Sequence, residues 1–129
     1  PLERDAIVPV YSLTKIVTAV AVLTLVEEGR IALDDPLERH LPEFRALRVM
    51  ALEGAGSPTL RAPARKPTIR HLLTHTSGFA TPGTGVPAAI AQLEQARLDD
   101  APDLATYCAR LANVPLALDP GRRFDYDGV

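Results

Sequence analysis

A long apolar segment without glycine or proline constrains the fold of this chain more than any other feature. Residues 14–28 contain neither helix breaker, and Gly29 follows at the position of a natural C-terminal stop. The side chains of residues 16–26 are apolar on nearly every face, and many are β-branched, which lowers helix propensity. Because burial must compensate for that loss, the pattern predicts a buried helix in a core larger than 129 residues normally build.

The same segment is too short to cross a membrane. Residues 16–26 are interrupted by two threonines and reach about half of the ~20 apolar residues that a membrane span needs. We therefore expect no integral membrane segment in this chain.

The composition limits the kinds of partner. The chain has 129 residues, 47% hydrophobic and 23% charged, with a formal net charge of −2, which is typical of one soluble globular unit. A near-neutral, interspersed charge pattern gives no basis for expecting nucleic acid or an anionic membrane surface as partner. Cys108 is the single cysteine, so an internal disulfide is excluded and a small buried hydrophobe is expected there.

The two ends of the chain carry no targeting information. The sequence begins at Pro1 with neither methionine nor signal peptide, and it ends at Val129 just after a motif considered below. We therefore expect a piece of a larger domain, and both the compartment (cytoplasmic or exported) and the oligomeric state stay open.

The rest of the chain is predicted to form short helices joined by loops, with little strand. Asp35 is expected to cap a short helix that has Pro36 at its first position and ends near Leu41. Thr68 is expected to cap a further helix, which Gly78 closes. The other expected elements are a short edge strand at 7–11, a hairpin pairing 48–52 with 59–62, and helices at 88–98 and 103–111.

A Ser-x-x-Lys motif at the start of the long helix is the first candidate for chemistry. Ser12 and Lys15 are three residues apart, so a helix places the lysine amine within reach of the serine hydroxyl. An apolar neighbourhood would lower the lysine pKa and let it act as a base, while the helix N-terminus favours negative charge on the serine oxygen. Taken alone, the motif also fits a serine that only caps the helix and a solvated lysine.

The surrounding sequence resembles the serine β-lactamase-related family, which contains class C β-lactamases, D,D-peptidases and esterases built on the same frame. The resemblance covers nearly the whole chain and is densest over residues 10–44 and 67–79. It is carried by three strings in unbroken order: YSLTK at 11–15, VEEGRIALDDP at 26–36 and PTIRHLLTHTSGF at 67–79. Ser-x-x-Lys is the nucleophile motif of β-lactamases and penicillin-binding proteins.

The resemblance also assigns a tyrosine. In this family a Tyr-x-Asn motif follows a Pro-Gly turn, and here a tyrosine, Tyr126, follows Pro120-Gly121. The resemblance implies that Tyr126 is the third catalytic residue and shuttles a proton between Ser12 and the leaving group, stabilised as phenolate by the nearby lysine. Without the resemblance, Tyr126 would be read as a half-buried core aromatic.

One position departs from the family pattern. Gly128 stands where the motif usually has the asparagine that orients the substrate's acyl side chain in the lactamase and peptidase branches. Its loss weakens the case for β-lactam or peptide substrates, and the sequence around Tyr11 and over 43–67 looks more like the esterase branch. Tyr11 and Gly128 are the expected substrate-binding positions.

The resemblance implies a helical domain packed against an antiparallel sheet flanked by helices, with the active-site cleft between them. This chain would be a mostly α segment of that α/β (α+β) β-lactamase/transpeptidase-like fold, supplying the nucleophile helix 12–28 and most of the helical part. The sheet and its Lys-Thr-Gly or His-x-Gly motif would lie largely outside these residues. The Ser12 backbone amide would be one oxyanion donor and that strand the other, and the chain alone should show exposed apolar faces and no activity.

The histidines are weaker candidates. His71 and His75 have a spacing that can hold a metal, but Leu72 replaces the glutamate base of His-Glu-x-x-His and no third ligand is evident, so no metal is expected. His75 with Ser77 is better explained by capping and packing than by a nucleophile pair. His40 is expected at the surface.

The sequence therefore predicts a serine hydrolase that works through an acyl-enzyme, without cofactor, on an ester, lactone or β-lactam. A carboxylesterase-like member is favoured, and a β-lactamase or D,D-peptidase is the alternative. A non-catalytic binding or sensor relative is the alternative of another class, and a structural helical domain with coincidental motifs is the third.

Overall fold

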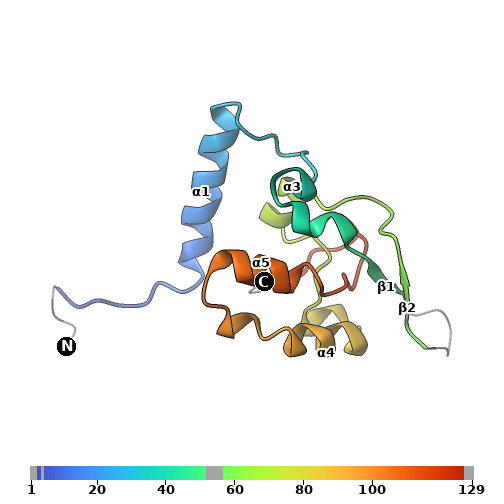
Figure 1. Ribbon diagram of the computed structural model, residues 1–129. Helices are drawn as coiled ribbons and strands as arrows, with labels where there is room; N and C mark the ends of the chain where they lie inside the picture. The colour runs from blue at the N-terminus through green and yellow to red at the C-terminus, as the bar shows by residue number, and fades with distance from the viewer. Residues whose placement is uncertain (1–2, 4, 52–56, 127–129) are drawn as a thin grey trace. The chain divides into compact units, whose positions relative to one another are not determined.

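The computed structural model describes residues 3, 5–51 and 57–126, which divide into two compact units, residues 1–32 and 33–129 (Figure 1). The first unit holds one helix, α1 (Leu13–Glu27), and the second holds the remaining helices and a small sheet. Each unit is described by itself.

Helix α1 is apolar but exposed. It follows Ser12, ends with Glu28 as C-cap, and Gly29 then adopts φ 66°, as its place after the helix predicts. Inside it, the hydroxyls of Thr18 and Thr24 donate to carbonyls one turn back, at 3.0 Å each. No α1 residue is buried, since α1 is the one helix or strand among the described residues of the first unit. The buried helix that we predicted is therefore not observed, whereas the exposed apolar faces are.

Residues 7–10 form no strand, so the edge strand predicted at 7–11 is wrong. Pro9 removes one backbone donor in this short segment, and residues 3 and 5–32 contain no strand for it to pair with.

The hairpin in the second unit is confirmed. Strands β1 (Val49–Ala51) and β2 (Thr59–Arg61) pair antiparallel, with Met50 opposite Leu60. A third segment lies along β1, since the Met50 amide donates to the Leu116 carbonyl and the Leu116 amide to the Arg48 carbonyl, both at 2.8 Å. Leu116 is fully buried, so this pairing ties the C-terminal loop into the core.

The core of the second unit gathers around an edge-to-face pair of rings, Phe44 and Phe79, whose centroids are 6.0 Å apart. Its other buried members are aliphatic: Leu37, Leu47, Val49, Leu111, Val114 and Leu116. Cys108 packs partly buried against this cluster, and burial raises the pKa of its thiol. The residue therefore behaves as the small hydrophobe that we expected.

Short helices cover this core. They are α2 (Leu37–His40), η1 (Pro42–Ala46), α3 (Ile69–Leu73), η2 (Pro82–Thr84), α4 (Pro87–Gln95), η3 (Leu98–Asp100) and α5 (Leu104–Leu111). The predicted cap at Thr68 is confirmed, since its hydroxyl accepts from the His71 amide at 3.3 Å. The structure adds a cap at Asp103, whose carboxylate accepts from the Thr106 amide at 2.7 Å. A mostly helical segment with one small antiparallel sheet is the fold class that the sequence predicted.

Asp35 does not cap α2 as predicted. Pro36 is the N-cap, and the buried Asp35 carboxylate instead bonds to Arg39 at 2.6 Å and His40 at 2.9 Å. A charged carboxylate at a buried position needs such partners, so both side chains of the α2 end fold back onto it. His40 is at the surface as expected.

Candidate active site

The expected nucleophile and its lysine lie on the first turn of α1. Ser12 is the N-cap with helical backbone angles, φ −64° and ψ −13°, and its side chain makes no capping hydrogen bond. The Lys15 amide donates to the Ser12 carbonyl at 3.1 Å and closes the turn between them. The two side chains therefore share one helix face, and the capping role considered for Ser12 is not observed.

The residue before the nucleophile has an unusual backbone. Tyr11 adopts φ 44°, in the left-handed region that few non-glycine residues occupy, and its side chain is exposed. Strained backbone of this kind clusters at functional sites. Its expected part in substrate binding stays a prediction.

Tyr126 lies at the end of the described chain and packs on a histidine. The rings of Tyr126 and His75 have centroids 4.8 Å apart at an interplanar angle of 47°. Phe124 contacts the same histidine edge to face at 5.9 Å. His75 thus packs against two aromatic rings of residues 117–126, the tyrosine segment.

Backbone hydrogen bonds also join residues 75–78 to the tyrosine segment. The Gly78 carbonyl accepts from the Ala117 amide at 2.8 Å, and the Thr76 carbonyl accepts from the Gly121 amide at 2.7 Å. The His75 carbonyl accepts from the Asp125 amide at 2.8 Å. Successive residues of the His-Thr-Ser-Gly string therefore fix the path of the chain up to the residue before Tyr126.

Gly78 is required by this pairing rather than by the end of α3. The helix ends at Leu73, five residues earlier, so the predicted role of Gly78 as its stop is wrong. Gly78 has φ 87°, and a Cβ there would collide with the Leu118 carbonyl. The absence of a side chain is what allows residues 78 and 118 to approach.

Polar contacts hold the tyrosine segment from the other side. Arg123 donates to the Gly83 carbonyl at 2.7 Å and pairs with Asp125 at 3.1 Å. A Cβ at Gly83 would lie 2.6 Å from the Asp125 carboxylate, so the turn η2 and this carboxylate are in close approach.

The loop that leads to the Pro120-Gly121 turn is anchored to the hairpin. Arg61 on β2 binds Asp119 through two hydrogen bonds, of 2.9 and 2.5 Å, and the Ala64 amide adds a third at 2.8 Å. The Arg61 hydrogen bonds lower the pKa of Asp119 to about 2. The carboxylate therefore stays charged and bonded at any neutral pH.

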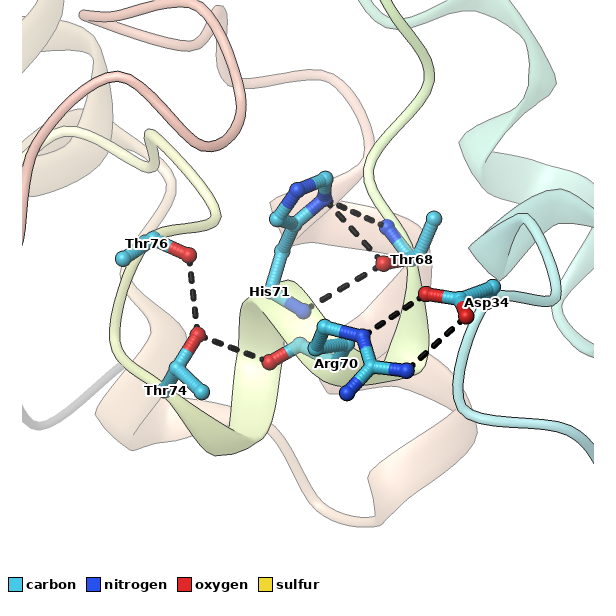
Figure 2. A network of polar contacts seen from close by, with 6 residues as sticks. All are labelled: Asp34, Thr68, Arg70, His71, Thr74 and Thr76. Carbon is cyan, nitrogen blue, oxygen red and sulfur yellow. Dashed lines mark hydrogen bonds and ion pairs between the residues drawn. The ribbon is translucent and has the colours of Figure 1, made fainter.

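Side chains hold the N-terminal turn of helix α3 (Figure 2). The Arg70 guanidinium binds Asp34 at 2.7 and 2.8 Å, which lowers the pKa of that carboxyl. At the N-terminus, His71 Nδ1 accepts from the Thr68 amide at 3.1 Å and completes a capping box. Burial, and then the nearby Arg65, lower the pKa of His71, which favours the neutral ring that this bond requires.

The two histidines of the candidate metal spacing have separate tasks. His71 uses Nδ1 in the capping box, while His75 lies beyond the helix end against Tyr126. Across residues 3, 5–51 and 57–126, no three His, Cys, Asp or Glu side chains come together as a metal site.

A small cavity lies behind the tyrosine segment. Its volume is about 70 Å³, and its lining includes His75, Ser77, Phe79, Arg123 and Asp125. Ligand pockets for drug-sized molecules measure about 300–1,000 Å³, so this cavity is well below that size.

The expected catalytic residues are thus distributed over two units. Ser12 and Lys15 come together in the first unit, and Tyr126 belongs to the second. Gly128 lies outside the described residues. The meeting of Ser12, Lys15 and Tyr126 in one cleft stays a prediction.

Sequence reasoning missed the link between residues 75–78 and the tyrosine segment. The His-Thr-Ser-Gly string was assigned to capping and packing of its own helix. The one available signal was a pair of glycines, Gly78 and Gly121, both of which prove to have positive φ. Nothing in the spacing indicated that the two segments are paired.

This combination of a Ser-x-x-Lys helix with a helical subdomain and small sheet defines a β-lactamase-type chain, and the family comparison agrees. The model of the Beta-lactamase family matches residues 1–129. The chain therefore belongs to this family, whose members include serine hydrolases and acyltransferases.

Three relatives illustrate the range of activities in the family. Protein Rv1367c of Mycobacterium tuberculosis is 41% identical over 98% of this chain and 31% of its own length. Esterase EstB of Burkholderia gladioli is 35% identical over 98% of this chain and 30% of its own. Acyltransferase calJ of Penicillium decumbens is 41% identical over 65% of this chain and 20% of its own.

The fold has a counterpart among solved structures. The unliganded simvastatin synthase (LovD) of Aspergillus terreus superposes with a TM-score of 0.71 and 34% identity, covering 99% of this chain and 32% of that one. The chain thus spans about a third or less of the proteins that it matches. In the part that the structure describes, no helix is long and apolar enough to cross a membrane.

Proposed function

We propose that the full-length protein containing this chain is a serine hydrolase that cleaves carboxylic esters through an acyl-enzyme on Ser12. The observation that carries the proposal is the Ser12–Lys15 turn at the start of α1, within a chain that belongs to the Beta-lactamase family. Lys15 and Tyr126 would complete the catalytic group.

The reaction would proceed in two steps. The Ser12 hydroxyl attacks the ester carbonyl carbon and gives its one proton to the Tyr126 oxygen, directly or through the Lys15 amine, and a tetrahedral oxyanion forms. The oxyanion collapses, the alcohol leaves with the proton returned from Tyr126, and an acyl-serine remains. Water then attacks the acyl-serine by the same relay and releases the carboxylic acid.

The oxyanion requires preorganised donors. The Ser12 backbone amide is the donor that this chain would supply, and removing one such donor typically costs about 2.7–4 kcal/mol of transition-state stabilisation. The second donor would come from a part of the protein beyond these residues. The chain by itself is therefore expected to be inactive.

Ester substrates are supported by two observations. Gly128 replaces the asparagine that serves lactamases and peptidases, which removes an amide that would orient an acylamino side chain. Esterase EstB is 35% identical over nearly the whole chain. A β-lactamase or D,D-peptidase activity is the less favoured alternative.

Acyl transfer is a second candidate because relatives such as Acyltransferase calJ carry that name. The same acyl-serine would serve both reactions, and only the second nucleophile differs: water for a hydrolase, an alcohol for a transferase. A non-catalytic binding relative is the candidate of another class.

The test is a comparison of substrates on the full-length protein. We expect a p-nitrophenyl ester to give a burst of nitrophenol and an acyl mass adduct, and a chromogenic cephalosporin to turn over far more slowly. Adding a primary alcohol would raise the steady-state rate and yield a new ester if the protein is a transferase. The variant Ser12→Ala should lose both burst and adduct, whereas Ser57→Ala, at an exposed serine, should keep them.

Burst and adduct retained in Ser12→Ala would overturn the assignment of the nucleophile. Absence of any adduct on the wild type with both acyl donors, the ester and the cephalosporin, would favour the non-catalytic relative.

A further inference from the structure

The His-Thr-Ser-Gly string has no part in the chemistry proposed above, yet it contacts the segment that carries Tyr126. Its histidine is the residue in closest ring contact with that tyrosine among the pairs described, with centroids 4.8 Å apart. Resting on the proposed catalytic role of Tyr126, we propose that His75 is a positioning residue that holds the Tyr126 ring in its reactive orientation.

Three contacts tie His75 to the tyrosine segment. Its carbonyl accepts from the Asp125 amide at 2.8 Å, which fixes the backbone one residue before Tyr126. Its ring packs on Tyr126 on one side and meets Phe124 edge to face at 5.9 Å. The backbone bond sets the position of the tyrosine, and the imidazole then restricts which way the phenol ring can turn.

The ring needs this restraint because the tyrosine is not buried. Tyr126 is 54% exposed and Phe124 is 64% exposed, so a packed core does not fix either side chain. A rotation about χ1 would carry the phenolic oxygen several ångströms from any fixed partner. Misplacement of a reacting group by about 1 Å can cost on the order of 100-fold in rate.

The backbone of His75 suits this role. It adopts φ 53°, in the left-handed region just past the end of α3, and this turn directs the chain from the helix to the tyrosine segment. Histidine, asparagine and aspartate tolerate that conformation better than most other residues. Of these three, only histidine has an aromatic ring to pack on Tyr126.

These properties define a pair of variants. His75→Asn keeps a residue that accepts the left-handed backbone and removes the ring, whereas His75→Phe keeps a ring and removes both imidazole nitrogens. Thr74→Ala is the matched control, because Thr74 is exposed and its hydroxyl bonds only to Arg70 and Thr76 among the contacts described.

We expect His75→Asn in the full-length protein to lower kcat for a p-nitrophenyl ester by about 10- to 100-fold, with little change in KM. His75→Phe should recover most of the rate despite its less tolerant backbone, and Thr74→Ala should match the wild type. Melting temperatures of all variants report folding. If His75→Asn folds poorly, Phe124→Leu is the second variant. It removes an exposed ring that contacts His75, and it should lower kcat by a smaller factor.

A double-mutant cycle with Tyr126→Phe separates positioning from a general loss of structure. If His75 acts through the phenol, His75→Asn should have no further effect on kcat once the phenolic oxygen is gone. Additive losses would overturn the inference, as would wild-type kcat in His75→Asn, or a His75→Phe variant no faster than His75→Asn. Unchanged kcat in Tyr126→Phe alone would instead overturn the catalytic role of Tyr126, and the inference with it.

Discussion

At the scale of single residues, Ser12 and Lys15 depend on their places in one helical turn. The Ser12 carbonyl accepts from the Lys15 amide, so a rigid turn sets the distance between the hydroxyl and the amine. The lysine must be able to give up and take back a proton for the relay to work. Charge alone therefore does not suffice at residue 15.

Lys15→Arg tests that requirement. Arginine keeps the positive charge and does not deprotonate in proteins, so kcat for ester hydrolysis should fall by at least about 100-fold. Lys66→Arg is the matched control, since Lys66 pairs with Glu38 far from the proposed chemistry in sequence. An active Lys15→Arg variant would show that residue 15 acts only as a charge.

Gly78 matters for packing at the same scale. Gly78→Ala combines an unfavourable left-handed backbone with a collision against the Leu118 carbonyl, and we expect a loss of about 3 kcal/mol in the free energy of unfolding. Gly85→Ala shares the positive φ, at 72°, but has open space around it, so it should lose only about 1–2 kcal/mol. Equal losses in urea titrations would argue against the close approach of residues 78 and 118.

At the scale of elements, α3 joins the strings that carry the family resemblance. Asp34 and Arg70 link its first turn to the segment after α1, and the capping box of Thr68 and His71 begins it. The residues that follow the helix then pair with the tyrosine segment. The stability of α3 should therefore affect the tyrosine segment.

The capping box makes that stability dependent on pH. The pKa of His71 is lowered by burial, so the folded state favours the neutral ring; its contribution is complete above the unfolded pKa near 6.5 and is lost as pH falls through the lower folded pKa. His71→Gln keeps a capping-box side chain that does not titrate, and it should remove this part of the acid loss in melting temperature between pH 7 and 5.

The control for this comparison is Thr68→Ala, which removes the hydroxyl that caps α3. It should cost about 1 kcal/mol at every pH rather than only in acid. A wild type and a His71→Gln variant with parallel pH profiles would contradict the role given to His71.

Local signals predicted some elements better than others. The hairpin of β1 and β2, the cap at Thr68 and the stop at Gly29 follow from rules about neighbouring residues, and the structure has each of them. The close approach of Gly78 to Leu118 and the pairing of Arg61 with Asp119 depend on segments distant in sequence. Contacts between distant segments do not alter the local spacing of apolar and polar residues, so the sequence pattern could not predict them.

At the scale of the whole molecule, the chain matches only a part of the length of its relatives. It spans about a third or less of its relatives, and its most apolar helix has no buried residue. Within its own unit the helix presents apolar side chains on its surface, and an apolar patch of this kind marks an interaction site. The sequence predicts a nucleophile and its lysine at residues 12 and 15 because their spacing is local, and their catalytic role stays a prediction. No local pattern in the chain specifies a substrate.

The central claim is that Ser12, Lys15 and Tyr126 form one catalytic group, and a crystal structure of the full-length protein tests it most directly. The decisive measurement is the distance between Ser12 Oγ and Tyr126 Oη. We predict hydrogen-bonding reach, about 2.6–3.2 Å or one bridging water, with Lys15 Nζ beside both oxygens. A phenolic oxygen turned into bulk solvent, or packed on another face from Ser12, would contradict the account.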